Sequence, residues 1–191
     1  NADNADSSWL HVDLPHDWAV EGPFDPDQNR AQGYRPRGIG WYRRYVALPL
    51  ADRGRNIELQ LDGVATHSTV WVNGILVNRN WSGYNGRSID VTPYLHYGKE
   101  VNTIAVRVDA EVMEGWWYEG AGMYRHTWLV KRDAVHVATD GIHANPVRKN
   151  GRWTLPVTVD VDSSAAAART ARLDVTLLAP DGREVARAAA P

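Results

Sequence analysis

The sequence predicts an all-β fold, a β-sandwich or jelly roll, and three observations support this. Apolar and polar residues alternate with a period of two through several short segments. Clusters of Gly, Pro, Asn and Asp separate most of these segments, as turns separate short strands. No helical pattern is long enough to cover a parallel sheet, and the single helical hint is one turn at Val91–Leu95.

The first strands are defined by alternation and by turn residues. The segment Trp41–Leu48 places Tyr42, Arg44 and Val46 on one face, and Asn56–Leu61 alternates in the same way before a turn. The pair Asn73-Gly74 between two such runs is the strongest short-range signal for a hairpin. The other predicted strands of this region are Thr66–Val72, Ile75–Val77, Ser88–Val91, Val101–Val108 and Tyr124–Lys131.

A change of composition near Ala134 predicts a second β-domain, so we expect domains at residues 1–134 and 135–191. Strand-like runs follow at Trp153–Val161 and Arg169–Leu178, with Arg183–Ala186 as a candidate returning strand. The alanine-rich stretch Ser163–Ala168 between them fits a flexible loop or a strand edge. A complete sandwich of this kind has about seven strands. We therefore expect the second domain to be truncated.

Composition excludes several classes of partner and cofactor. The 191 residues carry a net charge of −2 with both signs interspersed, which argues against a nucleic-acid or anionic-membrane partner. The absence of cysteine removes disulfides and thiolate metal sites and leaves the localisation undetermined. No apolar run approaches the roughly 18 residues that span a bilayer, and the opening NADNADSS lacks the features of a signal peptide. We expect a soluble mature chain.

Neither the histidines nor the acidic clusters predict a metal site. The seven histidines show no HxxxH or HExxH spacing, and the cluster Asp25–Asn29 does not match a calcium-binding EF-hand loop. We expect no cofactor and no metal. Aromatic usage, by contrast, is informative: nine Trp and eight Tyr stand against one Phe, and these amphipathic rings suit sugar faces as well as interfaces.

Four stretches between Leu14 and about Lys131 carry a resemblance to a known family. In chain order they are LPHDW from Leu14, GIGWYRRYVALP from Gly38, LDGVATHSTVWVNG from Leu61, and DVTPYL from Asp90 with WWYEGAGMYRHTWL beyond it. Together they resemble the sugar-binding domain that opens family 2 glycoside hydrolases of the β-galactosidase type. The resemblance implies a galactose-binding-like jelly roll followed by a partial immunoglobulin-like β-sandwich, the latter on position and topology more than on motif.

The family's chemistry implies that this chain has no catalytic residue. Its members hydrolyse β-glycosides with retention, using two glutamates on a following (β/α)8 barrel, and retention needs those carboxyl groups roughly 5 Å apart on a rigid scaffold. We expect no hydrolysis by this chain alone, although its parent would be a glycoside hydrolase. The partners implied are the parent's own TIM barrel and a β-galactoside, and a homo-oligomer stays open.

Asp17 is the first candidate site residue. The resemblance places a polar amide or acid here, on a loop that reaches the barrel's pocket and bonds a hydroxyl of the sugar. A carboxylate can accept two hydroxyl bonds at once, and charged acceptors make the stronger bonds. The alternative is that Asp17 caps a turn after Pro15, as Asp often does.

The stretch EGWWYEGAGMYR supplies the other candidates. Trp116 or Trp117 could stack on a sugar's apolar face, and Glu119 could bond hydroxyls or pair with Arg125. Alignment on the GMYR end puts Trp116 where some relatives hold an aspartate that helps to organise a sodium ion, which argues against a metal role here. The alternative is that the aromatics pack against the barrel while the glycines permit a strained turn.

The long polar loop Glu21–Arg37 is expected to be either functional or disordered, as structureless loops of this length usually are. Tyr34 and Arg35 within it could contact the substrate or the barrel, and we favour the barrel.

Two other classes of function compete with the accessory domain. One is an autonomous carbohydrate-binding module, which an exposed row of Trp and Tyr on a sheet face would favour, although the best aromatics are expected in loops. The other is a structural sandwich that mediates oligomer contacts, which a large apolar patch would mark. For the parent, a galactoside is favoured, with β-glucuronidase and β-mannosidase as alternatives.

Overall fold

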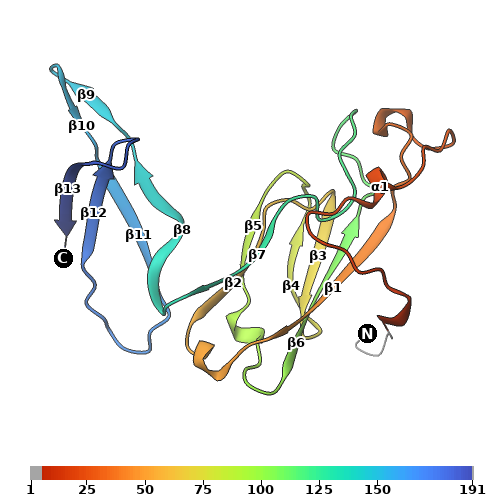
Figure 1. The fold of residues 1–191 in the computed structure, drawn as a ribbon, viewed down its shortest axis with the longest axis horizontal. Helices are drawn as coiled ribbons and strands as arrows, with labels where there is room; N and C mark the ends of the chain where they lie inside the picture. The colour runs from red at the N-terminus through yellow and green to blue at the C-terminus, as the bar shows by residue number, and fades with distance from the viewer. Residues whose placement is uncertain (1–5, 191) are drawn as a thin grey trace. The chain divides into compact units, whose positions relative to one another are not determined.

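The computed structural model describes residues 6–190 and is all-β, which confirms the predicted fold class. The chain divides into two compact units, residues 1–133 and 134–191, each of which is described by itself (Figure 1).

The first unit is a sandwich of two antiparallel sheets (Figure 1). The four-stranded sheet has the order β1-β6-β3-β4, with bounds β1 Ile39–Ala47, β6 Val101–Asp109, β3 His67–Val72 and β4 Ile75–Asn80. The three-stranded sheet has the order β5-β2-β7, with bounds β5 Arg87–Asp90, β2 Asn56–Leu61 and β7 Thr127–Arg132. Two facing sheets bury one face of each strand, which is why the sequence alternates.

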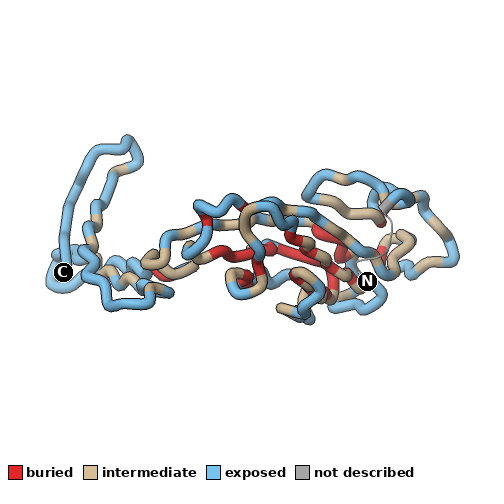
Figure 2. The backbone as a smooth tube through the Cα atoms, turned by 90° about the horizontal axis from the view of Figure 1, so that it is seen from below, coloured by how far each residue is buried: buried red, intermediate tan, exposed pale blue. Residues whose placement is uncertain are grey.

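The core lies between these sheets. Strand β6 alternates buried and half-buried residues along its length, and Val70, Val72 and Val108 are completely enclosed. Figure 2 shows most of the buried segments of the chain in the first unit. The remaining larger core residues are Leu48, Ile57, Leu59, Leu61, Val64, Ile89, Val91, Leu95, Ile104, Val106 and Met123.

The predicted strands of this unit are all present, with ends shifted by up to three residues. Asn73 and Gly74 both have positive φ, 50° and 82°, as the tight turn of the β3–β4 hairpin requires. A 3₁₀ turn occupies Thr92–Tyr94, inside the one predicted helical turn. Four short helical elements were not predicted from the sequence: α1 Trp18–Glu21 and the 3₁₀ turns Asp6–Ser8, Arg30–Gln32 and Leu50–Asp52.

The second unit consists of three two-stranded pairs. They are β8 Val135–Ala144 with β11 Val157–Ser163, β9 Val147–Lys149 with β10 Arg152–Thr154, and β12 Leu173–Leu178 with β13 Glu184–Ala190. Among residues 134–190 only Gly141 is buried, so these strands enclose no core of their own. The immunoglobulin-like identity of this unit stays a prediction.

In the second unit, strands β8 and β9 were not predicted from the sequence, and one predicted run was wrong. Strand β8 was missed because Asp140-Gly141 has the composition of a turn, whereas in the structure it lies within the strand, where the register with β11 shifts. The run Trp153–Val161 is two strands and not one, since Pro156 lacks the N–H that a continuous ladder needs.

Candidate functional site

Three loops and the segment before α1 meet at one end of the first unit. We call this the loop cluster and define it as residues 14–37, 81–86 and 110–126. Hydrogen bonds and an ion pair between these segments, which are far apart in the sequence, hold the loop cluster together.

Asp17 is tied into the loop cluster by five contacts. Its Oδ1 accepts hydrogen bonds from the amides of Ala19 (3.0 Å) and Val20 (3.3 Å), which makes it the N-cap of α1. The same oxygen accepts a bond from the Ala121 amide at 3.1 Å. The Tyr118 hydroxyl lies 2.8 Å from both Oδ1 and Oδ2. The capping role considered from sequence is therefore present, and Oδ2 is engaged by Tyr118 alone among the described residues.

Backbone pairing fixes the segment around Asp17 against the GAGMYR stretch. The His16 amide donates to the Met123 carbonyl at 2.9 Å, and the Trp18 amide donates to the Ala121 carbonyl at 3.0 Å. Gly122 sits between them and pairs on its other side with Ala65. A Cβ on Gly122 would lie 2.6 Å from the His16 carbonyl oxygen, so only glycine allows this close approach.

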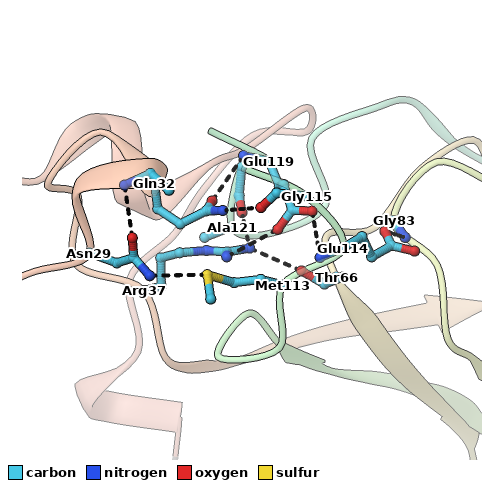
Figure 3. Close-up of polar contacts among 12 residues, drawn as sticks. Asn29, Gln32, Arg37, Thr66, Gly83, Met113, Glu114, Gly115, Glu119 and Ala121 are labelled. Carbon is cyan, nitrogen blue, oxygen red and sulfur yellow. Dashed lines mark hydrogen bonds and ion pairs between the residues drawn. The ribbon is translucent and has the colours of Figure 1, made fainter. Parts of the chain in front are cut away.

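A buried ion pair lies at the centre of the loop cluster (Figure 3). The Arg37 guanidinium lies 3.3 Å from the Glu119 carboxylate, and their side chains are 8% and 1% exposed. Arg37 Nη2 also donates to Thr66 Oγ1 at 3.0 Å and to the Gly120 carbonyl at 3.1 Å. Removal of either charge would leave the other buried without its counter-charge, so we expect the pair to constrain the geometry of the loops.

Hydrogen bonds extend from Glu119 to all three loops (Figure 3). Its Oε1 accepts from the Glu114 amide at 2.6 Å, and its own amide donates to Gln32 Oε1 at 3.2 Å. Gln32 is fully buried and donates in turn to the Gly115 carbonyl. The Glu114 carboxylate accepts from the Gly83 amide at 2.8 Å, which connects the loop at residues 81–86.

Exposed aromatic side chains surround this polar centre. Trp116 is 92% exposed and Trp117 is 56% exposed, while Trp81 and Tyr84 from the β4–β5 loop are 65% and 42% exposed. Trp117 Nε1 donates to the Tyr84 hydroxyl at 2.6 Å, and Trp81 lies edge-on to His67. Large exposed indoles on a fixed framework are suited to stacking on a flat apolar surface such as a sugar face.

The structure departs from the sequence expectations for two charged residues. Glu119 pairs with Arg37 and not with Arg125, whose guanidinium lies over the Tyr124 ring at 5.4 Å. Arg35 folds back on its own loop: it donates to the carbonyls of Val20 and Gly22 and lies over the Phe24 ring at 3.8 Å.

Arg37, Gln32, Trp81 and Tyr84 were not singled out from the sequence. Arg37 and Gln32 lie in a loop without periodicity, so no pattern marks them as buried. For Trp81 and Tyr84 a signal existed, because two aromatics in a short loop after a predicted hairpin strand are exposed by default.

The described residues contain neither a grouping suited to a metal ion nor a helix that could span a membrane. In residues 6–190 no group of three or more His, Asp or Glu side chains is arranged to hold a metal ion. The same stretch contains no helix of the length and apolarity needed to cross a membrane.

Tyr42, which contacts the loop cluster from strand β1, and Tyr118 within the loop cluster both have raised pKa values. Burial raises the pKa of Tyr42 from 10.0 to about 12, with the charges of Asp17 and Glu21 adding to the effect against an opposing bond from the Met123 amide. Burial, together with its hydrogen bond to Asp17, also raises the pKa of Tyr118. Both groups therefore favour the neutral phenol in the folded state.

We expect stability to fall at alkaline pH. Because the folded-state pKa of Tyr42 lies above its ordinary value, its contribution is fully present below pH 10.0 and is lost as the pH rises toward about 12. Circular dichroism should show loss of structure across this window, while ultraviolet absorbance of tyrosinate reports ionisation. The Tyr42→Phe variant should lose less stability across the same window. An identical alkaline loss in that variant would contradict the assignment.

The fold and the loop cluster together define a class of protein, a β-sandwich domain whose loops at one end carry exposed aromatic rings and a carboxylate. The family model described as the sugar binding domain of glycosyl hydrolases family 2 matches residues 2–133. The chain belongs to glycoside hydrolase family 2.

Sequence identity to two relatives supports membership in this family. A β-galactosidase of Bacteroides ovatus is 42% identical over 142 residues, which cover 73% of this chain and 17% of that protein. A putative β-glucuronidase of Formosa agariphila is 32% identical over 184 residues, which cover 95% of this chain and 17% of that protein. The chain thus corresponds to about a sixth of the length of these two relatives.

Solved structures of family 2 enzymes have a similar fold over nearly the whole chain. A β-glycosidase from Bacteroides vulgatus matches with a TM-score of 0.86 and 30% identity, over 98% of this chain and 24% of that one. A β-glucuronidase from Bacteroides uniformis matches with a TM-score of 0.85 and 28% identity, over 100% of this chain and 23% of that one.

Proposed function

We propose that this chain is a non-catalytic region of a retaining β-galactosidase-type glycoside hydrolase, in which the loop cluster borders the terminal sugar subsite on a (β/α)8 barrel. One observation carries the proposal: the Arg37–Glu119 network holds Asp17 and the exposed indoles at the same end of the sandwich. The catalytic glutamates and the barrel belong to the proposed whole protein, and the sugar is its proposed substrate.

Each candidate residue has a chemical role in this proposal. Asp17 Oδ2 accepts only the Tyr118 hydroxyl among the described residues, so it retains acceptor capacity for a sugar hydroxyl. Trp116 presents most of its indole to solvent and would stack on the apolar face of the sugar, with Trp117 beside it. Glu119 is enclosed, and we assign it the positioning of these loops in place of direct sugar contact.

A galactoside is the favoured substrate of the proposed enzyme. The higher of the two identities, 42%, is to a β-galactosidase, and a putative β-glucuronidase follows at 32%. The β-glucuronide is therefore the principal alternative, with the β-mannoside behind it.

Hydrolysis of nitrophenyl β-galactoside, β-glucuronide and β-mannoside tests the proposal. The purified chain should turn over none of them, and the longer natural polypeptide should cleave one. In that polypeptide Asp17→Asn should lower kcat/KM by about 10- to 100-fold, the loss expected for one hydrogen bond to a charged group. Turnover by the purified chain would overturn the non-catalytic assignment.

A matched pair of tryptophan variants tests the loop cluster itself. Trp116→Ala should raise KM for the cleaved glycoside in the longer polypeptide, because a stacking surface is lost. Trp153→Ala removes a similarly exposed indole from the second unit and should leave KM unchanged. Equal effects from the two variants would contradict a subsite role for Trp116.

A second function, an autonomous carbohydrate-binding module, is favoured by one observation that the sequence analysis did not anticipate. Trp41 and Trp71 stack at 5.3 Å across the outer face of the four-stranded sheet, and Trp41 is 49% exposed. Calorimetric titration of the chain with galacto-oligosaccharides would detect such binding, and Trp41→Ala should abolish it. Absence of binding would contradict the autonomous module.

A further inference from the structure

Two exposed aromatic side chains of the loop cluster, Trp81 and Tyr84, have no role in the proposed function. Both come from the β4–β5 loop, and they are 65% and 42% exposed. Trp116 and Trp117, which the proposed function assigns to the terminal sugar, come from a different loop. Exposed large apolar surface that gathers in one place marks an interaction site. We call these four side chains the aromatic surface.

Three hydrogen bonds join the two loops that carry the aromatic surface. The Gly83 amide donates to the Glu114 carboxylate at 2.8 Å (Figure 3), and the Gly83 carbonyl accepts from the Tyr124 hydroxyl at 2.9 Å. Trp117 Nε1 donates to the Tyr84 hydroxyl at 2.6 Å. Contacts within the chain therefore set the position of one loop against the other.

The β4–β5 loop is also closed internally, so Trp81 is held in place. Asn80 is 4% exposed, and its side-chain amide donates to the carbonyls of Ser82 at 2.7 Å and Asn85 at 3.2 Å. The Trp81 ring lies edge-on to that of His67, with 5.1 Å between the ring centres. A ring that is already fixed loses little conformational freedom when a ligand stacks on it, which favours a binding role.

The polar groups beside these rings are uncharged and suit sugar hydroxyls. Residues 81–86, WSGYNG, contain no Asp, Glu, Lys or Arg. The Tyr84 hydroxyl oxygen accepts the bond from Trp117, and its own hydrogen has no acceptor among residues 6–190. The exposed Asn85 side chain supplies both a donor and an acceptor. Apolar rings with a few neutral hydrogen-bonding groups beside them match the two chemical faces of a sugar.

We propose that Trp81, Tyr84 and Asn85 form a second sugar subsite, so that the substrate is an oligosaccharide whose penultimate sugar, a neutral one, stacks on Trp81. This inference rests on the proposed function, which assigns the terminal sugar to Trp116. The Trp117–Tyr84 bond joins the two subsites, and consecutive sugars of one substrate lie over the rings of the two loops. Contacts to a second sugar raise kcat/KM for oligosaccharides over single-sugar glycosides.

Two substrates that differ by one sugar test this subsite in the longer natural polypeptide. β-Galactosyl fluoride occupies the terminal subsite alone, whereas β-1,4-galactobiose also presents a second sugar. Trp81→Ala should lower kcat/KM for galactobiose by about 3- to 10-fold, the loss of one stacking contact, and should leave kcat/KM for the fluoride within about 2-fold. Trp81→Phe keeps a ring and should restore most of the galactobiose rate. If the polypeptide cleaves a different sugar, the fluoride and the disaccharide of that sugar replace this pair.

A matched control and the Trp116→Ala variant make the result specific. Trp153→Ala removes an indole that is 67% exposed, against 65% for Trp81, and should change kcat/KM for neither substrate. An equal loss on both substrates after Trp81→Ala would overturn the second subsite, because a ring that supports the fold or the barrel affects every substrate. The absence of a loss on either substrate would overturn it as well.

The terminal subsite is tested separately with the fluoride. Trp116→Ala should raise KM for the fluoride, and an unchanged KM would contradict the proposed function whatever the result with galactobiose. A failure of Trp81→Ala alone would leave the proposed function intact and remove only the second subsite.

Discussion

The Arg37→Met variant should lose about 3–5 kcal/mol of the free energy of unfolding of the first unit, the cost expected when one partner of a buried ion pair is removed. The remaining Glu119 carboxylate is 1% exposed, so it would have neither solvent nor a counter-charge. Urea denaturation followed by tryptophan fluorescence measures this, because every Trp except Trp153 lies in residues 1–133.

A control and a double variant make the result specific. Arg55→Met breaks an ion pair with Asp133 whose side chains are 42% and 78% exposed, and a 4.0 Å contact with Asp52, which keeps its 2.6 Å pair with Lys131. It should therefore cost at most about 1 kcal/mol. The double variant Arg37→Met with Glu119→Leu should recover part of the loss, since it no longer leaves a buried charge. A loss below 1 kcal/mol for Arg37→Met alone would show that the pair does not hold the loops.

The strands of the first unit could be predicted because their pattern has a local physical cause. Each strand of a sandwich buries every second side chain, so Ile57, Leu59 and Leu61 alternate in the sequence as they do in the core. The Asn73-Gly74 turn was equally visible, since few residues tolerate two consecutive positive φ angles. Both signals depend on residues adjacent in the chain.

The interior of the loop cluster could not be predicted because its contacts join distant residues without periodicity. Arg37 and Glu119 are 82 positions apart, and the sequence offered the nearby Arg125 as the obvious partner. Burial of Gln32 likewise depends on the fold of two other loops. Asp17 could be chosen from its motif, yet its bonds to Tyr118 and Ala121 are visible only in the structure.

A substitution at Gly122 tests whether the two motif stretches are held by close backbone approach. Gly122 has φ +137°, and a Cβ there would lie 2.5 Å from the Tyr42 hydroxyl and 2.6 Å from the His16 carbonyl oxygen. The second contact is with backbone, which cannot rotate away. Gly122→Ala should therefore combine about 1–3 kcal/mol of backbone strain with about 1–3 kcal/mol of overpacking.

Gly38 provides a control that isolates the steric part. Its φ is +129°, close to that of Gly122, but a Cβ there would meet nothing within 4 Å. Gly38→Ala should cost only the strain, so the difference between the two variants in urea denaturation measures the close approach. Gly122→Ala should also weaken the Ala121 amide's bond to Asp17 and expose the Asp17 segment to proteolysis. Equal losses for the two variants would show that the segments can separate at no cost, and Asp17 would then lack the fixed position that a sugar subsite requires.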